Sequence, residues 1–174
     1  MKRLTEEQAI ELLKKYSSSE KDFEAVLKHS KNVQKEALRI AAKVKNTDKE
    51  LIKIGSLLHD IGRFRKDLVY RHGLNGAEML RKEGFEEYAK VAERHLGAGI
   101  SKQDIKKQKL KLPMKDFVPL SKEEKIISYA DNLIEDNKLI SVKQVIKRYK
   151  DELGEEVAEK IKKQHEEIMK MMKE

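Results

Sequence analysis

Apolar residues recur three or four positions apart along most of this chain, and no other feature constrains its fold as much. Residues 22–45 carry Phe23, Val26, Leu27, Val33, Ile40 and Val44 at helical spacing. The next segment repeats Leu51, Ile54 and Leu58 on one side. No segment shows the sustained alternation of β-branched and polar residues that a strand requires. The sequence therefore predicts an all-α protein, an irregular helical bundle without a sheet.

Short polar motifs predict where further helices begin and end. Thr47 with Glu50, and Ser121 with Glu124, match the capping-box pattern at a helix start. Ser101 and Asp104 can cap a short helix in the same way. Pro113 and Pro119 mark a loop, and Gly62 and Gly154 are expected to end helices. We expect helices over residues 49–61, 75–82, 86–94, 121–136, 141–153 and 155–174.

The charge and the missing cysteines limit the chemistry. Charged residues make up 40% of the chain and the formal net charge is +8. Lysines alternate with glutamates along most helices, as on a solvated face, although a positive surface also attracts nucleotides, RNA or anionic lipid. Without cysteine, a tightly bound metal must use histidine nitrogens and carboxylate oxygens. The first residues resemble neither a signal peptide nor a membrane span, so we expect a cytoplasmic protein without a membrane partner.

Three predicted helices direct a histidine or an aspartate toward their apolar side. His29 lies between Val26 and Val33. His59 shares a helix face with Gly55, which precedes it by one turn. Asp131 is flanked in the same way by Ile127 and Ile134. A buried carboxylate needs a cation, which could be arginine, lysine or a metal. A lone histidine of this kind is more often a satisfied core residue than a ligand, and a lone aspartate is more often a salt-bridge partner or a buried cap.

Taken together, these residues resemble a known family. The string LLHDIGR at residues 57–63 looks like the motif of the HD superfamily of metal-dependent phosphohydrolases. In that family an earlier histidine, a His-Asp pair and a distant aspartate bind the metal. His29 in LKHSKNV, His59 with Asp60, and Asp131 in ISYADNL match these positions. The resemblance covers about residues 20–137 and implies an HD-type helical domain over residues 1–140. Residues 141–174 would form C-terminal helices packed on the same domain.

Two further histidines match the positions that hold a second metal in some HD families. They are His72 in RHGLNGAEML and His95 in ERHLGAG. The resemblance implies that Asp60 bridges two metals, as in bacterial HD hydrolases of symmetrical dinucleoside tetraphosphates. His29, His59 and Asp131 would complete one metal site, and His72 with His95 the other. Without the family, His72 is a loop residue and His95 a helix end; His165 has no counterpart and is expected at the surface.

The resemblance implies hydrolysis of a nucleotide or another small phosphate ester by metal-activated water. One or two divalent ions would be required, from among Fe, Mn, Zn, Co and Mg. Asp60 would be catalytic. Arg63, next to the pair, and Arg94, next to His95, are candidates for holding phosphate oxygens.

Two other functions fit the same residues. Some HD-type proteins with four histidines and two aspartates are di-iron oxygenases, such as the myo-inositol oxygenase family. A non-catalytic module could also bind a nucleotide or RNA through the basic run at residues 102–115. The chain has only five Tyr and four Phe, so stacking platforms for single-stranded RNA are sparse. The H-E-x-x-H, P-loop and G-x-S-x-G motifs are absent.

Overall fold

Helices dominate the computed structural model, which describes residues 3–174. In that part the chain forms nine α-helices, two 3-10 helices and one small hairpin. In chain order these are α1 Glu6–Tyr16, α2 Glu20–Ala41, α3 Lys49–Leu58, η1 Ile61–Phe64, η2 Val69–Arg71, α4 His72–Lys82, α5 Glu86–Arg94, α6 Lys102–Gln108, α7 Lys122–Asn132, β1 Ile134–Glu135, β2 Lys138–Leu139, α8 Val142–Leu153 and α9 Glu155–Met171. The all-α prediction is confirmed. Across residues 3–174 we find no helix with the length and apolar character that crossing a membrane requires.

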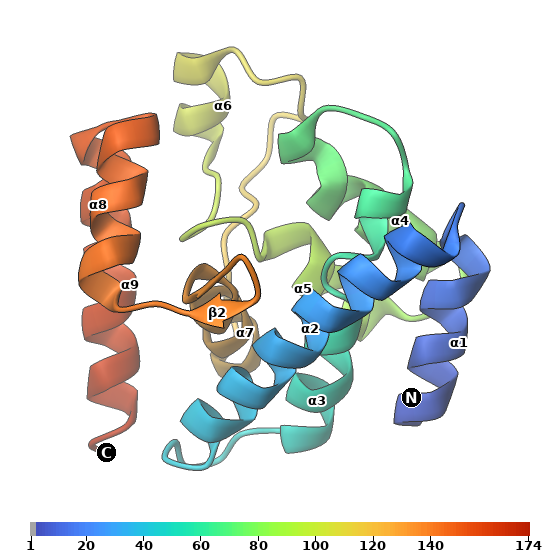
Figure 1. Ribbon diagram of the computed structural model, residues 1–174. Coiled ribbons are helices and arrows are strands. Elements are labelled where there is room, and N and C mark those ends of the chain that lie inside the picture. Colours follow the sequence, from blue (N-terminus) through green and yellow to red (C-terminus); the bar gives the residue numbers. More distant parts are fainter. Residues whose placement is uncertain (1–2) are drawn as a thin grey trace.

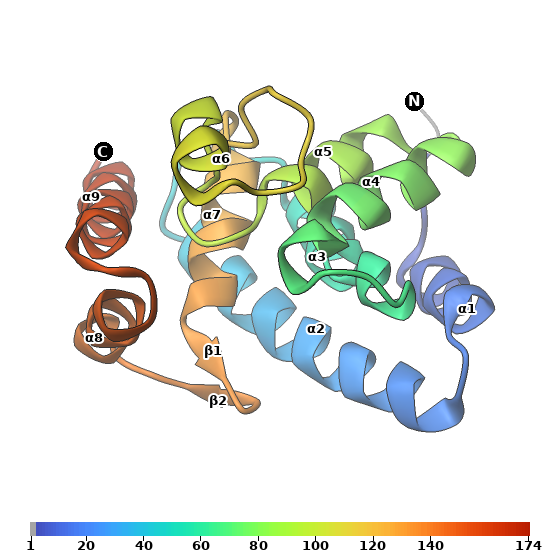
Figure 2. The ribbon, with the colours of Figure 1, turned by 90° about the horizontal axis from the view of Figure 1, so that it is seen from above.

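The long helix α2 runs across the bundle (Figure 1). Seen from above, α1 lies at one flank, and α8 and α9 lie side by side at the other (Figure 2). A first core packs α1, α3 and α4 together around Leu13, Leu57 and Leu80. A second core joins the end of α2 to α7 and α9 around residues such as Ile127 and Ile161.

The metal-ligand candidates lie where the two cores meet. On α2, Val26 belongs to the first core and Val33 to the second, and His29 comes between them. On α3, the glycine beneath His59 receives side chains from both sides: a Cβ at Gly55 would lie 3.1 Å from Ile127 and 3.3 Å from Val91. The small residue therefore allows α5 and α7 to approach α3 closely, as the sequence indicates.

Two helix starts agree with the predicted caps and one does not. Ser101 and Asp104 form a complete capping box at α6. Ser121 caps α7, although the Glu124 carboxylate turns to the backbone N–H of Leu120 instead of completing the box. The prediction for Thr47 is wrong, because Asp48 caps α3 by accepting from the backbone N–H of Leu51.

Three predicted boundaries are also wrong. α2 ends at Ala41, and Asn46 adopts a positive φ of 55° in the turn that follows. α7 ends at Asn132 rather than at residue 136. The expectation of no sheet is also wrong, because β1 and β2 pair on either side of Asp136 and Asn137. Both of these residues have positive φ, which a two-residue hairpin turn requires and which Asp and Asn tolerate.

The third boundary is the start of α4, which begins at His72 rather than at residue 75. Its two glycines are needed for packing and do not mark a loop. A Cβ at Gly73 would lie 2.8 Å from the carbonyl oxygen of Ala92, and one at Gly76 would lie 3.1 Å from the backbone nitrogen of Gly62.

His165, expected at the surface, is half-buried, and its Nδ1 lies 2.6 Å from the Tyr129 hydroxyl.

Candidate metal centre

A break in the helix lets the neighbouring residues His59 and Asp60 face the same point. On a regular helix their side chains would diverge by about 100°. α3 ends at Leu58, and at Asp60 the backbone leaves helical geometry with φ −100° and ψ 8° before η1 begins. Gly62 was expected to end this helix. It lies inside η1 instead, and the helix ends before it.

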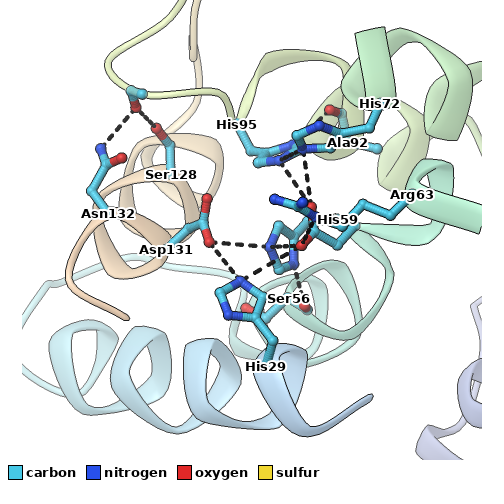
Figure 3. A network of polar contacts seen from close by, with 12 residues as sticks. His29, Ser56, His59, Arg63, His72, Ala92, His95, Ser128, Asp131 and Asn132 are labelled. Atoms are coloured by element: carbon cyan, nitrogen blue, oxygen red, sulfur yellow. Dashed lines mark hydrogen bonds and ion pairs between the residues drawn. The ribbon is translucent and has the colours of Figure 1, made fainter. Parts of the chain in front are cut away.

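His29 on α2, His59 just after the end of α3 and Asp131 on α7 converge on one point (Figure 3). Asp131 Oδ1 lies 2.9 Å from His29 Nε2 and 3.4 Å from His59 Nε2. The same two nitrogens lie 3.6 Å and 3.7 Å from Asp60 Oδ2. Two nitrogens and two carboxylate oxygens therefore surround one point, a donor set that divalent cations accept.

The other oxygen of Asp60 faces a second pair of histidines. Asp60 Oδ1 lies 3.1 Å from His72 Nε2 and 3.4 Å from His95 Nε2. These two nitrogens are 3.0 Å apart. Asp60 thus offers one carboxylate oxygen to each side, which is the geometry of a bridging ligand.

Backbone carbonyls fix the orientation of three of these imidazoles. The Nδ1 atoms of His59, His72 and His95 lie 2.7, 2.6 and 2.8 Å from carbonyl oxygens. Each carbonyl belongs to the residue three positions earlier: Ser56, Val69 and Ala92. Because a carbonyl only accepts, each Nδ1 carries a proton, and Nε2 is the nitrogen that faces the cluster. The facing Nε2 atoms of His72 and His95 can share a proton or bind a metal ion.

Four of the six ligand candidates (His59, Asp60, His72 and His95) are buried, and two of their atoms lack a hydrogen-bond partner within residues 3–174. His59 is 0% exposed and Asp60 is 2% exposed. The unpartnered atoms are His59 Nε2 and Asp60 Oδ1. Leaving buried polar atoms unpaired is costly, whereas a metal ion would satisfy both. The residues present therefore fit the divalent metals that HD domains bind.

The electrostatics match this arrangement. Burial lowers the pKa of His59, but the Asp60 and Asp131 carboxylates outweigh burial and raise this pKa to about 9. Burial acts to raise the pKa of both carboxyl groups, yet the nearby histidines hold it well below the usual range. The two acids thus remain ionised and able to bind a cation.

The two arginines proposed from the sequence lie in different places. Arg63 Nε donates to Asp60 Oδ2 at 2.6 Å, and its half-exposed side chain lines a cleft beside the cluster. Arg94 instead donates to both oxygens of Glu124, at 3.0 and 3.1 Å, and does not line that cleft. The structure thus brings Arg63 to the site but not Arg94, because neighbouring residues on a helix point in different directions.

The cleft contains residues that the sequence analysis did not find. It has a volume of about 710 Å³ and runs from His29, His72 and Asp131 to α8 and α9. Arg148 and Tyr149 of α8 line it. The sequence around them shows only an ordinary amphipathic helix, which gives no sign that this helix faces the site.

A hydrogen-bond network connects α8 to the segments that carry the metal-ligand candidates. The carbonyl of Gly97, two residues after His95, accepts from Ser128 Oγ at 2.7 Å, Asn132 Nδ2 at 2.9 Å and Gln164 Nε2 at 3.3 Å. The Tyr149 hydroxyl donates to Asn132 Oδ1 at 2.7 Å. Burial and the Asp131 carboxylate raise the pKa of Tyr149 to about 12, so the hydroxyl keeps its proton at neutral pH.

Curated proteins similar to this chain come from archaea. An uncharacterised protein of Methanocaldococcus jannaschii is 43% identical, covering 85% of this chain and 86% of its own length. The tRNA (cytidine(56)-2'-O)-methyltransferases of Picrophilus torridus and Thermoplasma volcanium are each 38% identical over 94% and 92% of this chain. The chain spans just under half of these two relatives, 46% and 45% of their length.

The structural neighbours share the fold. The HD domain of the L. monocytogenes phosphodiesterase PgpH in complex with cyclic-di-AMP superposes with a TM-score of 0.60. It is 17% identical, and the match covers 94% of this chain and 91% of that domain. A second structure of the same domain gives a TM-score of 0.53 at 16% identity. The family model of the HD domain matches residues 26–136, which include all six ligand candidates. The chain therefore belongs to the HD domain family.

Proposed function

We propose that this protein is a metal-dependent phosphohydrolase that acts on a nucleotide. The observation that carries the proposal is the placement of Asp60, with one carboxylate oxygen toward His29 and His59 and the other toward His72 and His95. Membership of the HD family supports it. So does the fold shared with PgpH, a phosphodiesterase whose HD domain has been solved with a nucleotide.

The chain's own residues would divide the work as follows. His29, His59 and Asp131 would hold one divalent ion, His72 and His95 a second, and Asp60 would bridge them. Bound metal supplies a water of lowered pKa and polarises a phosphoryl oxygen. Imidazole nitrogens with carboxylate oxygens favour Fe, Mn, Zn or Co over Mg, which prefers oxygen ligands alone. Arg63, half-exposed and beside Asp60, would orient a phosphate oxygen.

A second candidate substrate is a nucleotide within an RNA. The match to two archaeal tRNA methyltransferases, over just under half of their length, favours it because those proteins act on RNA. Salt dependence separates the two substrates. RNA binding through several lysines weakens steeply between about 50 and 200 mM salt, whereas binding of a mononucleotide changes little.

The direct test measures metal content and phosphate release. The purified protein is analysed for metal, loaded separately with Mn, Fe, Co and Zn, and assayed on a panel of nucleotides, dinucleoside polyphosphates and a short RNA. We expect His59→Ala and Asp60→Asn to lose activity. His165→Ala, which removes a histidine bonded to Tyr129 away from the cluster, should keep it.

Full activity in the two cluster variants, or no metal above background, would refute the proposal. Oxygen consumption by the iron-loaded protein without phosphate release would point instead to the di-iron oxygenase alternative.

A further inference from the structure

One wall of the cleft comes from outside the family domain. The family model ends at residue 136, whereas α8 and the start of α9 contribute Arg148, Tyr149, Glu152, Leu153, Val157 and Lys160. We call these six residues the C-terminal wall. In Figure 1, α8 stands at the edge of the bundle with α9 behind it. The volume of about 710 Å³ far exceeds what a phosphate group needs, so the cleft has room for the rest of a substrate.

The apolar stripe of α8 is only partly covered. It consists of Val142, Val145, Ile146, Tyr149 and Leu153, at helical spacing. Val145 is buried in the second core, and Ile146 and Tyr149 pack against it. Leu153, at the end of the stripe, lines the cleft and is 55% exposed. The stripe thus continues beyond its packing partners into the cleft.

The opposite side of the cleft is also partly apolar. Leu96, Ile100 and Leu110 line it half-buried, and Tyr70 lies beside them. Val69, which is 78% exposed, lies at the same cleft. Apolar side chains from both segments therefore line the cleft, and a flat group bound there would cover part of this apolar surface.

Polar groups are interspersed along the same walls. Arg148 donates to Glu135 Oε1 at 2.8 Å and to the carbonyl of Asn132 at 3.3 Å. Asn132 directly follows the ligand candidate Asp131 in the sequence. Farther along the cleft, Lys160 pairs with Asp104, and Gln108 and Glu152 also line it. Arg148 and Lys160 already have partners in the protein, and the polar atoms that remain along the cleft can hydrogen-bond with a base and a ribose.

From this juxtaposition we propose that the C-terminal wall is a nucleoside subsite. The base and ribose of a nucleoside monophosphate lie in the cleft along the C-terminal wall, Leu153 packs on the base, and the phosphate points toward the metal centre. This inference rests on the proposed function, since it places the phosphate there. It deepens that function by assigning recognition of the nucleoside to helices outside the matched domain.

The test compares binding of two phosphonates, whose P–C bond resists hydrolysis: the phosphonate analogue of AMP, and methylphosphonate. Calorimetry is performed on the metal-loaded wild type, on Leu153→Asp and on Leu139→Asp. Leu139 is a matched control, because it is 59% exposed on β2 and does not line the cleft. We expect the AMP analogue to bind at least about tenfold more tightly than methylphosphonate. Leu153→Asp should remove most of that advantage, and Leu139→Asp should retain it.

Equal binding of the two phosphonates would overturn the subsite, as would an equal loss in both variants or binding of RNA alone. If the AMP analogue binds with the expected pattern but no ester is hydrolysed, the subsite stands and the proposed hydrolysis fails. If the protein hydrolyses small esters without a preference for nucleotides, the proposed hydrolysis stands and the subsite fails.

Discussion

Gly62 is the position where a single methyl group should do most damage to the metal centre. Its backbone presses on α4, and a Cβ there would lie 1.9 Å from the carbonyl oxygen of His72 and 2.4 Å from the backbone nitrogen of Gly76. Both neighbours are backbone atoms, which cannot rotate away. Relieving the clash requires η1 and α4 to separate by about 1 Å, and these elements carry Arg63 and His72.

The magnitude follows from this overlap. Overpacking a core costs about 1–3 kcal/mol, and an overlap with rigid backbone belongs at the upper end, so we expect Gly62→Ala to lower the free energy of unfolding by about 3 kcal/mol. In a chain of this size that corresponds to a decrease in Tm of roughly 6–12 °C. Because Asp60 and His72 would move apart, the affinity for the second metal should also fall.

Gly55→Ala is the matched comparison on α3. The new Cβ would meet only the side chains of Ile127 and Val91, at 3.1 and 3.3 Å, which can shift slightly. Replacing a helical glycine by alanine gains about 1 kcal/mol, which offsets this compression. We therefore expect Gly55→Ala to remain within about 1 kcal/mol of the wild type in denaturant unfolding. A Gly62→Ala protein as stable as Gly55→Ala would refute the reasoning.

Three further predictions concern the metals, pH and the C-terminal helices. Metal analysis should find two ions per wild-type chain and one in His72→Ala or His95→Ala, with His165→Ala unchanged; equal metal content in all four proteins would contradict the two-metal site. Burial acts to raise the pKa of Glu93, but Arg81 and Lys115 outweigh it and lower this pKa. The resulting stability should be complete above the ordinary value of 4.5 and be lost as the pH falls below it, so acid unfolding of Glu93→Gln should show a flatter pH profile than the wild type. Tyr149→Phe removes the hydrogen bond to Asn132 and should lower the free energy of unfolding by about 1 kcal/mol in thermal unfolding; an unchanged Tm would contradict this contribution of the hydroxyl.

Most helices could be predicted from the sequence because they carry an apolar period or a cap of their own, whereas α1 at Glu6–Tyr16 was not predicted. It did not predict the hairpin after α7, although Asp136 and Asn137 are residues that tolerate the positive φ of a tight turn. The start of α4 was placed too late because glycines that serve packing, such as Gly73, resemble loop glycines when no neighbour is visible.

The same distinction applies to the site. His59 and Asp131 could be proposed because their types are unusual on an apolar face. The side-chain direction of Arg94 could not, since its partner Glu124 is 30 residues away. Arg148 and Tyr149 went unnoticed because their place in the cleft depends on how α8 docks, which the helical pattern does not encode.

The carbonyls that hold His59, His72 and His95 have an evolutionary consequence. They belong to the main chain at Ser56, Val69 and Ala92, and no substitution at these positions deletes a main-chain carbonyl. Mutations in the surrounding side chains can therefore accumulate while the imidazoles keep their tautomer and direction, as long as the local turn persists. Such mutational tolerance would allow the side chains around the site to change while the imidazoles keep their orientation.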